Sequence, residues 1–192
     1  MVAEKRIVAG ECQSIDCPVL VTERLVLRPP HQDDIPDLAR LAANPRIARM
    51  LARMPHPYGT EEAEAFVALA QEGNAPGGTW AVTIGETGAF VGCAGLDPSM
   101  RGLELGYWIG EPHWGKGYAT EAAEALVDLA FRATGIDMLH AACRTVNAAS
   151  RRVIRKSGFR YAGEDVMDSL AAGSVPVERY VLDRDDWLEL RA

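Results

Sequence analysis

The clearest pattern in the chain is an alternation of unlike residues over positions 103–109, followed by a helical spacing beyond residue 120. One side of the alternation consists of Leu103, Leu105, Tyr107 and Ile109. This period of two predicts a strand with two different faces. Further on, apolar residues recur at the spacing of a helix face, namely Ala123, Leu126, Val127, Ala130 and Phe131. We expect a helix there, closed by Gly135 as its C-terminal cap.

A glycine-rich loop joins this strand to this helix. The strand is expected to end near Gly110, because Gly115 and Gly117 permit the unusual φ angles of a tight loop. Such a loop leaves backbone N–H groups unpaired at the positive end of the helix dipole, which suits a phosphate. Lys116 can add a positive charge and Thr120 a hydroxyl donor. The spacing is neither G-x-x-x-x-G-K-[ST] nor G-x-G-x-x-G, so neither a P-loop nor a Rossmann site is predicted.

Shorter patterns divide the rest of the chain. Further strands are expected at residues 24–28, 79–84, 89–96, 138–143, 159–167 and 177–183, and further helices at 35–42, 47–53, 60–70 and 185–188. The glycines of residues 85–88 predict a hairpin, so an antiparallel meander precedes the loop. Because a helical crossover leads from the 103–109 strand to the 138–143 strand, those two should be parallel. Residues 1–21 show no periodicity and are expected to form an N-terminal extension, in which residues 19–21 can pair at a sheet edge.

Composition excludes several classes of function. The chain has 192 residues, of which 48% are hydrophobic, and is therefore sized for a single domain with a substantial core. Its net charge of -7 argues against nucleic-acid binding, since a phosphate backbone requires a basic surface. Without an apolar run of about 20 residues or a hydrophobic signal core, we expect a cytoplasmic protein with no membrane partner. The cysteines lack zinc-like spacing, so we expect no metal, and Cys12 and Cys17 are expected to be reduced.

Three segments resemble the GNAT N-acetyltransferase superfamily. Residues 114–119, WGKGYA, are similar to its Q/R-x-x-G-x-G/A loop, which holds the pyrophosphate of acetyl-CoA, except that Trp114 replaces Gln or Arg. Residues 147–159 resemble its second cofactor region and residues 22–28 its opening strand. The longer string around the loop is similar to the RimJ/RimL-type branch of ribosomal-protein N-terminal acetyltransferases.

The resemblance implies a GNAT fold for residues 22–190 as a single domain. This is an α/β (α+β) architecture with a central mixed, mostly antiparallel sheet, a parallel strand pair that splays apart, and helices on both faces. Gly106 is expected to mark a bulge that begins the splay.

The resemblance also implies roles for individual residues. Glu104 would accept the proton of the acceptor amine, either directly or through a water, and partial desolvation would suit it to that task. Ser150 would protonate the departing thiolate, with Tyr161 as a less favoured alternative. The residues expected to bind acetyl-CoA are Trp108, Ile109, Trp114, Gly115, Lys116, Gly117, Tyr118, Ala119, Thr120 and Asn147. Asn147 also suits a purely local role as the N-cap of the following helix.

The predicted activity is acetyl transfer from acetyl-CoA to a primary amine, by direct attack in a ternary complex. Deprotonating a lysine side chain at pH 7 costs about 4.6 kcal/mol, whereas an α-amino group costs only about 1 kcal/mol. A protein or peptide N-terminus is therefore the favoured acceptor. A small amine such as a polyamine, amino acid or aminoglycoside is the rival, and a non-catalytic acyl-CoA sensor is a different class of alternative. The resemblance also allows a homodimer.

Overall fold

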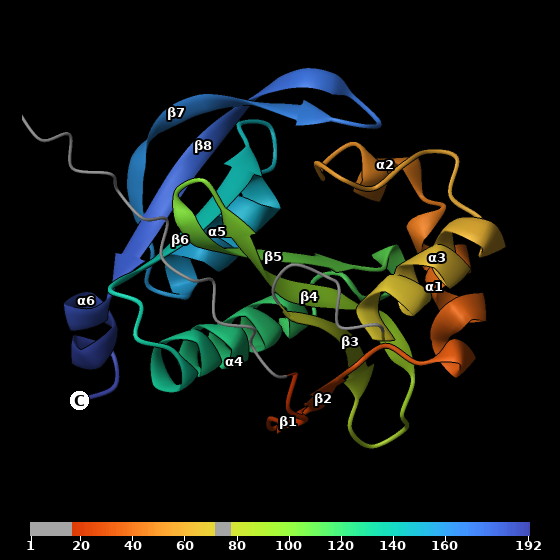
Figure 1. Ribbon diagram of the computed structural model, residues 1–192, viewed down its shortest axis with the longest axis horizontal. Coiled ribbons are helices and arrows are strands. Elements are labelled where there is room, and N and C mark those ends of the chain that lie inside the picture. The colour runs from red at the N-terminus through yellow and green to blue at the C-terminus, as the bar shows by residue number, and fades with distance from the viewer. Residues whose placement is uncertain (1–16, 72–77) are drawn as a thin grey trace, which may run out of the picture.

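A computed structural model describes residues 17–71 and 78–192, in which the strands form one mixed sheet in the order β1-β2-β3-β4-β5-β6-β8-β7 (Figure 1). The strands are β1 (Leu20–Val21), β2 (Leu25–Arg28), β3 (Gly78–Ile84), β4 (Phe90–Ser99), β5 (Gly102–Ile109), β6 (Met138–Arg144), β7 (Arg160–Ser169) and β8 (Gly173–Asp183). All neighbouring strands are antiparallel except β5 and β6, which are parallel. This confirms the expected mixed sheet and its single crossover.

Helices cover both faces of the sheet, which confirms the rest of the expected fold class (Figure 1). The helical elements are η1 (Gln32–Asp34), α1 (Ile35–Ala42), α2 (Pro45–Ala48), α3 (Thr60–Gln71), η2 (Glu111–His113), α4 (Tyr118–Ala133), α5 (Ala148–Lys156) and α6 (Arg184–Glu189). One buried cluster joins the sheet to α4, α5 and α6, through side chains such as Leu126, Ile154 and Trp187. A second cluster joins the opposite face to α1, α2 and α3, through side chains such as Leu38, Ile47 and Val67.

The parallel strands β5 and β6 separate part-way along their length. Their pairing covers only Leu103 with Leu139, Glu104 with His140, and Leu105 with Ala141. Beyond this point β5 stays paired to β4 as far as Ile109, and β6 stays paired to β8 as far as Arg144. The sheet therefore opens between residues 106–109 and residues 142–144.

Some expected details were wrong. The β4–β5 register runs without a shift, so Gly106 marks the start of the opening without forming a bulge. The second helix spans Pro45–Ala48 instead of residues 47–53, because Asn44 accepts a hydrogen bond from the Arg46 N–H and Pro45 occupies the first turn. β4 continues through Pro98 to Ser99, beyond the expected end of this strand at residue 96.

The expected extension at residues 1–21 is described only from residue 17. Residues 1–16, with Cys12, lie outside the described residues, while Leu20 and Val21 form the edge strand β1 beside β2. No helix in the described ranges is long and apolar enough to cross a membrane.

The C-terminal end of α4 is closed by a side chain from the far end of the chain. Gly135 does not adopt the left-handed conformation expected of a cap. Instead the guanidinium of Arg184 donates hydrogen bonds to the carbonyl oxygens of Phe131 at 3.0 Å, Thr134 at 3.0 Å and Ile136 at 2.8 Å. It satisfies carbonyls that the helix end leaves unpaired and ties α6 to α4.

We therefore expect Arg184→Ala to lower the free energy of unfolding by about 2 kcal/mol, because several carbonyls lose a charged donor. Urea unfolding followed by circular dichroism measures this change. The control is Arg160→Ala, which removes an exposed arginine paired with Asp183 and should change stability by less than about 0.5 kcal/mol. Equal effects of the two substitutions would contradict the capping role.

Candidate active site

The loop before α4 presents unpaired backbone amides. Gly115 and Gly117 have φ angles of 75° and 83°, and Gly117 caps α4 without help from a side chain. Within the described chain, the amides of Gly117, Tyr118 and Ala119 make no backbone hydrogen bond. Three donors therefore point out of the positive end of a 16-residue helix. This is the arrangement that binds a phosphate group.

Arg24 fastens this loop to the edge of the sheet. Its guanidinium donates to the carbonyl oxygen of Lys116 at 2.9 Å and pairs with the carboxylate of Glu121 at 2.7 Å. Burial opposes ionisation of Glu121, but hydrogen bonds from Thr22 and Arg24 outweigh it and lower the pKa of that carboxyl group. The carboxylate thus stays charged and holds Arg24 beside the loop.

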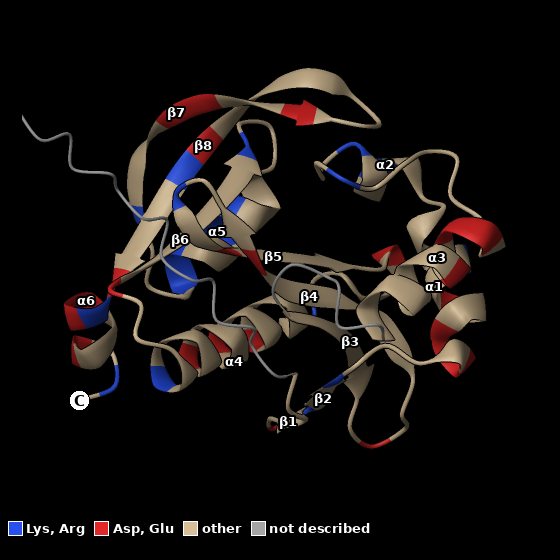
Figure 2. Cartoon of the chain, viewed as in Figure 1, with Lys and Arg blue, Asp and Glu red and all other residues tan. Residues whose placement is uncertain are grey.

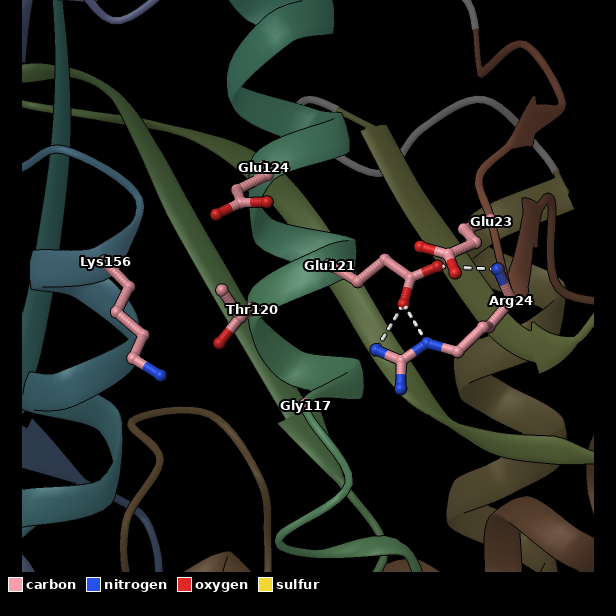
Figure 3. A pocket seen from close by; sticks show the side chains of 7 residues that line it. All are labelled: Glu23, Arg24, Gly117, Thr120, Glu121, Glu124 and Lys156. Atoms are coloured by element: carbon pink, nitrogen blue, oxygen red, sulfur yellow. Dashed lines mark hydrogen bonds and ion pairs between the residues drawn. The ribbon is translucent and has the colours of Figure 1, made fainter.

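A cavity of about 320 Å³ lies against the first turn of α4 (Figure 3). Gly117, Thr120 and Lys156 are among the residues that line it. Figure 3 shows the Lys156 side chain, from the end of α5, and the Thr120 hydroxyl pointing into the same space. Lys156 therefore joins the loop amides as a positive group at this end of the site.

Trp114 anchors the other end of the loop. Its indole N–H donates to the carbonyl oxygen of Ile109 at 2.6 Å, at the last residue of β5. The guanidinium of Arg46 lies 5.1 Å from its ring centroid, a cation–π distance. At the position where the loop pattern has Gln or Arg, this chain uses a tryptophan that fixes the loop to the strand.

Two hydroxyl groups meet beside the opening, on the face covered by α4 and α5. The hydroxyl of Tyr107, on β5, lies 2.9 Å from Ser150 Oγ and also donates to the Ser150 carbonyl oxygen at 3.2 Å. Burial raises the pKa of Tyr107, so its phenol stays protonated. The carbonyl oxygen of the Asn147 side chain caps α5 by accepting a hydrogen bond from the Ser150 N–H at 3.1 Å.

α5 itself is fixed by an ion pair. Arg151 donates to the two carboxylate oxygens of Glu178, on β8, at 2.7 and 2.6 Å, and to the Thr145 carbonyl oxygen at 2.8 Å. Since Ser150 precedes Arg151 on the same turn, these bonds hold its hydroxyl against β5.

Carboxylates gather on the opposite face of the opening. Glu104 lies on β5 and shares a cavity of about 450 Å³ with Arg101, Asp165 and Arg179. Arg179 Nη1 is 3.3 Å from Glu104 Oε1, and Arg179 Nε is 3.2 Å from Asp165 Oδ2. Acidic and basic residues are interspersed on the strands around this face, as Figure 2 shows.

The structure thus separates the expected catalytic residues onto two faces. Ser150 lies beside the opening, whereas Tyr161 lies on β7, two strands from β6, with its ring half exposed against Tyr180. Glu104 lies in the part of β5 that is paired with β6, and the guanidinium of Arg179 is the neighbour of its carboxylate.

Sequence reasoning did not single out Tyr107, Arg24 or Lys156 for the site. Tyr107 occupies an ordinary position in the alternation of the predicted strand, and Arg24 lies at the start of another predicted strand. Lys156 lies in the segment that resembles the second cofactor region. That position was the one signal in the sequence that could have placed it near the loop.

A scan of family models matches residues 24–160 to the acetyltransferase (GNAT) domain. This span includes the glycine-rich loop, both strands of the opening and the helix that carries Ser150. The chain belongs to the GNAT acetyltransferase family. It is therefore an acyltransferase, and acetyl-CoA is its co-substrate.

Relatives of this GNAT chain cover most of its length. It is 31% identical over 159 residues to the uncharacterized N-acetyltransferase YoaA of Bacillus subtilis, covering 76% of this chain and 85% of that protein. It is 30% identical over 190 residues to the FsC-acetyl coenzyme A-N(2)-transacetylase of Aspergillus fumigatus, covering 91% and 80%. A solved structure of RimL, a ribosomal L7/L12 alpha-N-protein acetyltransferase in complex with coenzyme A, superposes with a TM-score of 0.71 at 22% identity, covering 88% of this chain and 99% of that one.

The residues of this GNAT chain fit acetyl-CoA. The diphosphate requires several N–H donors with no side chain in the way, and no atom lies within 4 Å of the position of a Cβ on Gly115. Lys116 and Lys156 supply positive charge at the same end. A thioester that reaches into the β5–β6 opening has Ser150 and Tyr107 on one side and Glu104 on the other.

We expect Gly117→Ala to weaken coenzyme A binding about 10-fold. A non-glycine residue in the left-handed region costs about 1–2 kcal/mol, and the added Cβ would lie 3.2 Å from Arg24 Nη2. Isothermal titration calorimetry with coenzyme A measures the loss. Gly135→Ala is the matched control, because no atom lies within 4 Å of that Cβ position and its φ is not left-handed. Unchanged binding by Gly117→Ala would mean that the loop does not hold the diphosphate.

Proposed function

We propose that this GNAT enzyme transfers an acetyl group from acetyl-CoA to the α-amine of a protein or peptide N-terminus. The observation that carries the proposal is the opening between β5 and β6, which has hydroxyl groups on one face and carboxylates on the other. Acyl transfer to an amine releases a proton from the nitrogen and delivers one to the thiolate. The two faces supply groups for these two transfers.

On the carboxylate face, Glu104 takes part in removing the proton of the acceptor amine. The nitrogen then attacks the thioester carbonyl carbon, and the backbone amide of Ile109 stabilises the charge that develops on the carbonyl oxygen. Amides alternate along a strand, so the Trp108 amide faces β4, as the Gly110 amide does, and the Ile109 amide faces the opening. No covalent enzyme intermediate is needed, because the amine itself is the nucleophile.

On the hydroxyl face, Ser150 donates a proton to the departing thiolate, and Tyr107 positions it. When the Tyr107 hydroxyl donates to Ser150 Oγ, the Ser150 proton is free to point toward the sulfur. The side-chain N–H groups of Asn147, whose carbonyl oxygen already caps α5, are free to donate to the pantetheine arm.

An N-terminal acceptor is supported by the low cost of its deprotonation, about 1 kcal/mol at pH 7 against about 4.6 kcal/mol for lysine. The likeness to RimJ/RimL-type sequences in the loop also supports it. A small-molecule amine is the second candidate, because a relative over most of the chain is named FsC-acetyl coenzyme A-N(2)-transacetylase, which specifies an N(2) nitrogen and no protein N-terminus.

The acceptor class can be tested by measuring thiol release from acetyl-CoA. We expect turnover with a peptide whose N-terminus is free, and at least about 10-fold less with the same peptide when its N-terminus is blocked and only a lysine is available. Polyamines, free amino acids and aminoglycosides complete the panel. Turnover confined to these small amines would replace the proposed acceptor, and coenzyme A binding without turnover on any amine would indicate a sensor.

Loss of the hydroxyl groups should lower kcat without weakening acetyl-CoA binding. We expect about a 100-fold loss for Ser150→Ala and about a 10-fold loss for Tyr107→Phe, within the range of general acid catalysis. Tyr161→Phe is the matched control and should retain the wild-type kcat, since Tyr161 lies on β7 away from the opening. A greater loss for Tyr161→Phe than for Ser150→Ala would reverse the assignment.

A further inference from the structure

A second carboxylate lies directly opposite Glu104 on the acceptor face. Asp97, on β4, pairs in register with Glu104 on β5, so the two side chains leave the sheet on the same side. The next pair along the same face is Gly95 with Gly106. This face of the sheet therefore has two carboxylates followed by two positions without side chains.

The carboxylate of Asp97 leans over those glycines. Its Oδ2 atom is 3.9 Å from the position that a Cβ would take on Gly95, and equally 3.9 Å from that on Gly106. Gly106 is the first residue of β5 beyond its pairing with β6. The Asp97 side chain thus reaches the level of Gly106, where the sheet opens, from a backbone position directly opposite Glu104.

In the part of the chain that the structure describes, the carboxylate of Asp97 also accepts fewer hydrogen bonds than that of Glu104. Its Oδ2 pairs with Arg53, whose side chain is 66% exposed, while its Oδ1 accepts no hydrogen bond within the described residues. Both oxygens of Glu104 lie 3.3 Å from Arg179 Nη1. Burial raises the pKa of Asp97 and outweighs the lowering effect of Arg53, which makes its carboxylate a stronger base than an exposed aspartate.

We propose that Asp97 is the residue that directly accepts the proton of the acceptor ammonium, and that Glu104 keeps its negative charge beside it. This inference rests on the proposed function. An N–H bond of the ammonium breaks and the proton passes to Asp97 Oδ1, which leaves a lone pair on nitrogen for attack on the thioester carbonyl carbon. The C–S bond then breaks and the thiolate takes the proton of Ser150. The second amine proton passes through water to restore the Ser150 hydroxyl, and Asp97 releases the first proton to water.

The pair also explains how the site receives a cation. An ammonium placed between Asp97 and Glu104 meets two carboxylates, whose own partners, Arg53 and Arg179, approach from the outer sides of the face. A bare patch over Gly95 and Gly106 leaves room for the atoms attached to the amine. Any side chain at Gly106 would occupy the path between the ammonium and the opening.

The test compares steady-state kinetics of the full-length enzyme and its variants, with an acceptor that the wild type acetylates. We expect Asp97→Asn to lower kcat about 100-fold, with the KM for acetyl-CoA within about twofold of wild type. Glu104→Gln, which keeps Asp97, should lose only about 10-fold. In Asp97→Ala, added formate should raise the rate in proportion to its concentration, because it can occupy the vacated place over the glycines.

The control for a merely structural role is Arg53→Ala, which removes the ion pair but keeps the carboxylate, and which should retain kcat within about threefold. An equal loss of kcat in Arg53→Ala and Asp97→Asn would overturn the proposal. A kcat for Asp97→Asn within threefold of wild type would also overturn it. So would a failure of formate to raise the rate of Asp97→Ala. A greater loss in Glu104→Gln than in Asp97→Asn would return the proton transfer to Glu104. If the wild type acetylated no amine at all, the proposed function would fail first, and that result is separate from these comparisons.

Discussion

The end of pairing between β5 and β6 is the constraint on which the rest of the site depends. Both strands are held on their outer sides, β5 by β4 as far as Ile109 and β6 by β8 as far as Arg144. They therefore cannot close on each other after Leu105 and Ala141, and the backbone groups that face the gap have no strand partner. A ligand that fills the opening can form hydrogen bonds with those backbone groups. An extended chain such as pantetheine has the shape to do so.

The opening also separates two kinds of chemistry. On one face, α5 brings Ser150 to Tyr107, and Arg151 fixes that helix to β8. On the other face, the register of β4 and β5 places Asp97 beside Glu104. Because acyl transfer removes a proton at nitrogen and adds one at sulfur, a sheet with a gap allows each group to work on its own side without competing for the same proton.

Local features of the site could be read from the sequence because they depend on neighbouring residues. The loop before α4 followed from its glycines, the parallel strand pair from a helical crossover, and the cap of α5 from Asn147. Predictions failed where a distant partner decided the outcome. Arg184 took over the closure of α4 expected of Gly135.

The sequence by itself determined the order of strands and helices along the chain, the glycine-rich loop before α4 and the resemblance to the GNAT family, since periodicity and turn residues act over a few positions. Only the tertiary structure decided which side chains meet at the opening. Tyr107 and Ser150 are 43 residues apart in the chain, and Arg53 and Asp97 are 44 apart. Such contacts are set by strand register and helix packing, which no local pattern encodes, and they bring these side chains together beside the opening between β5 and β6.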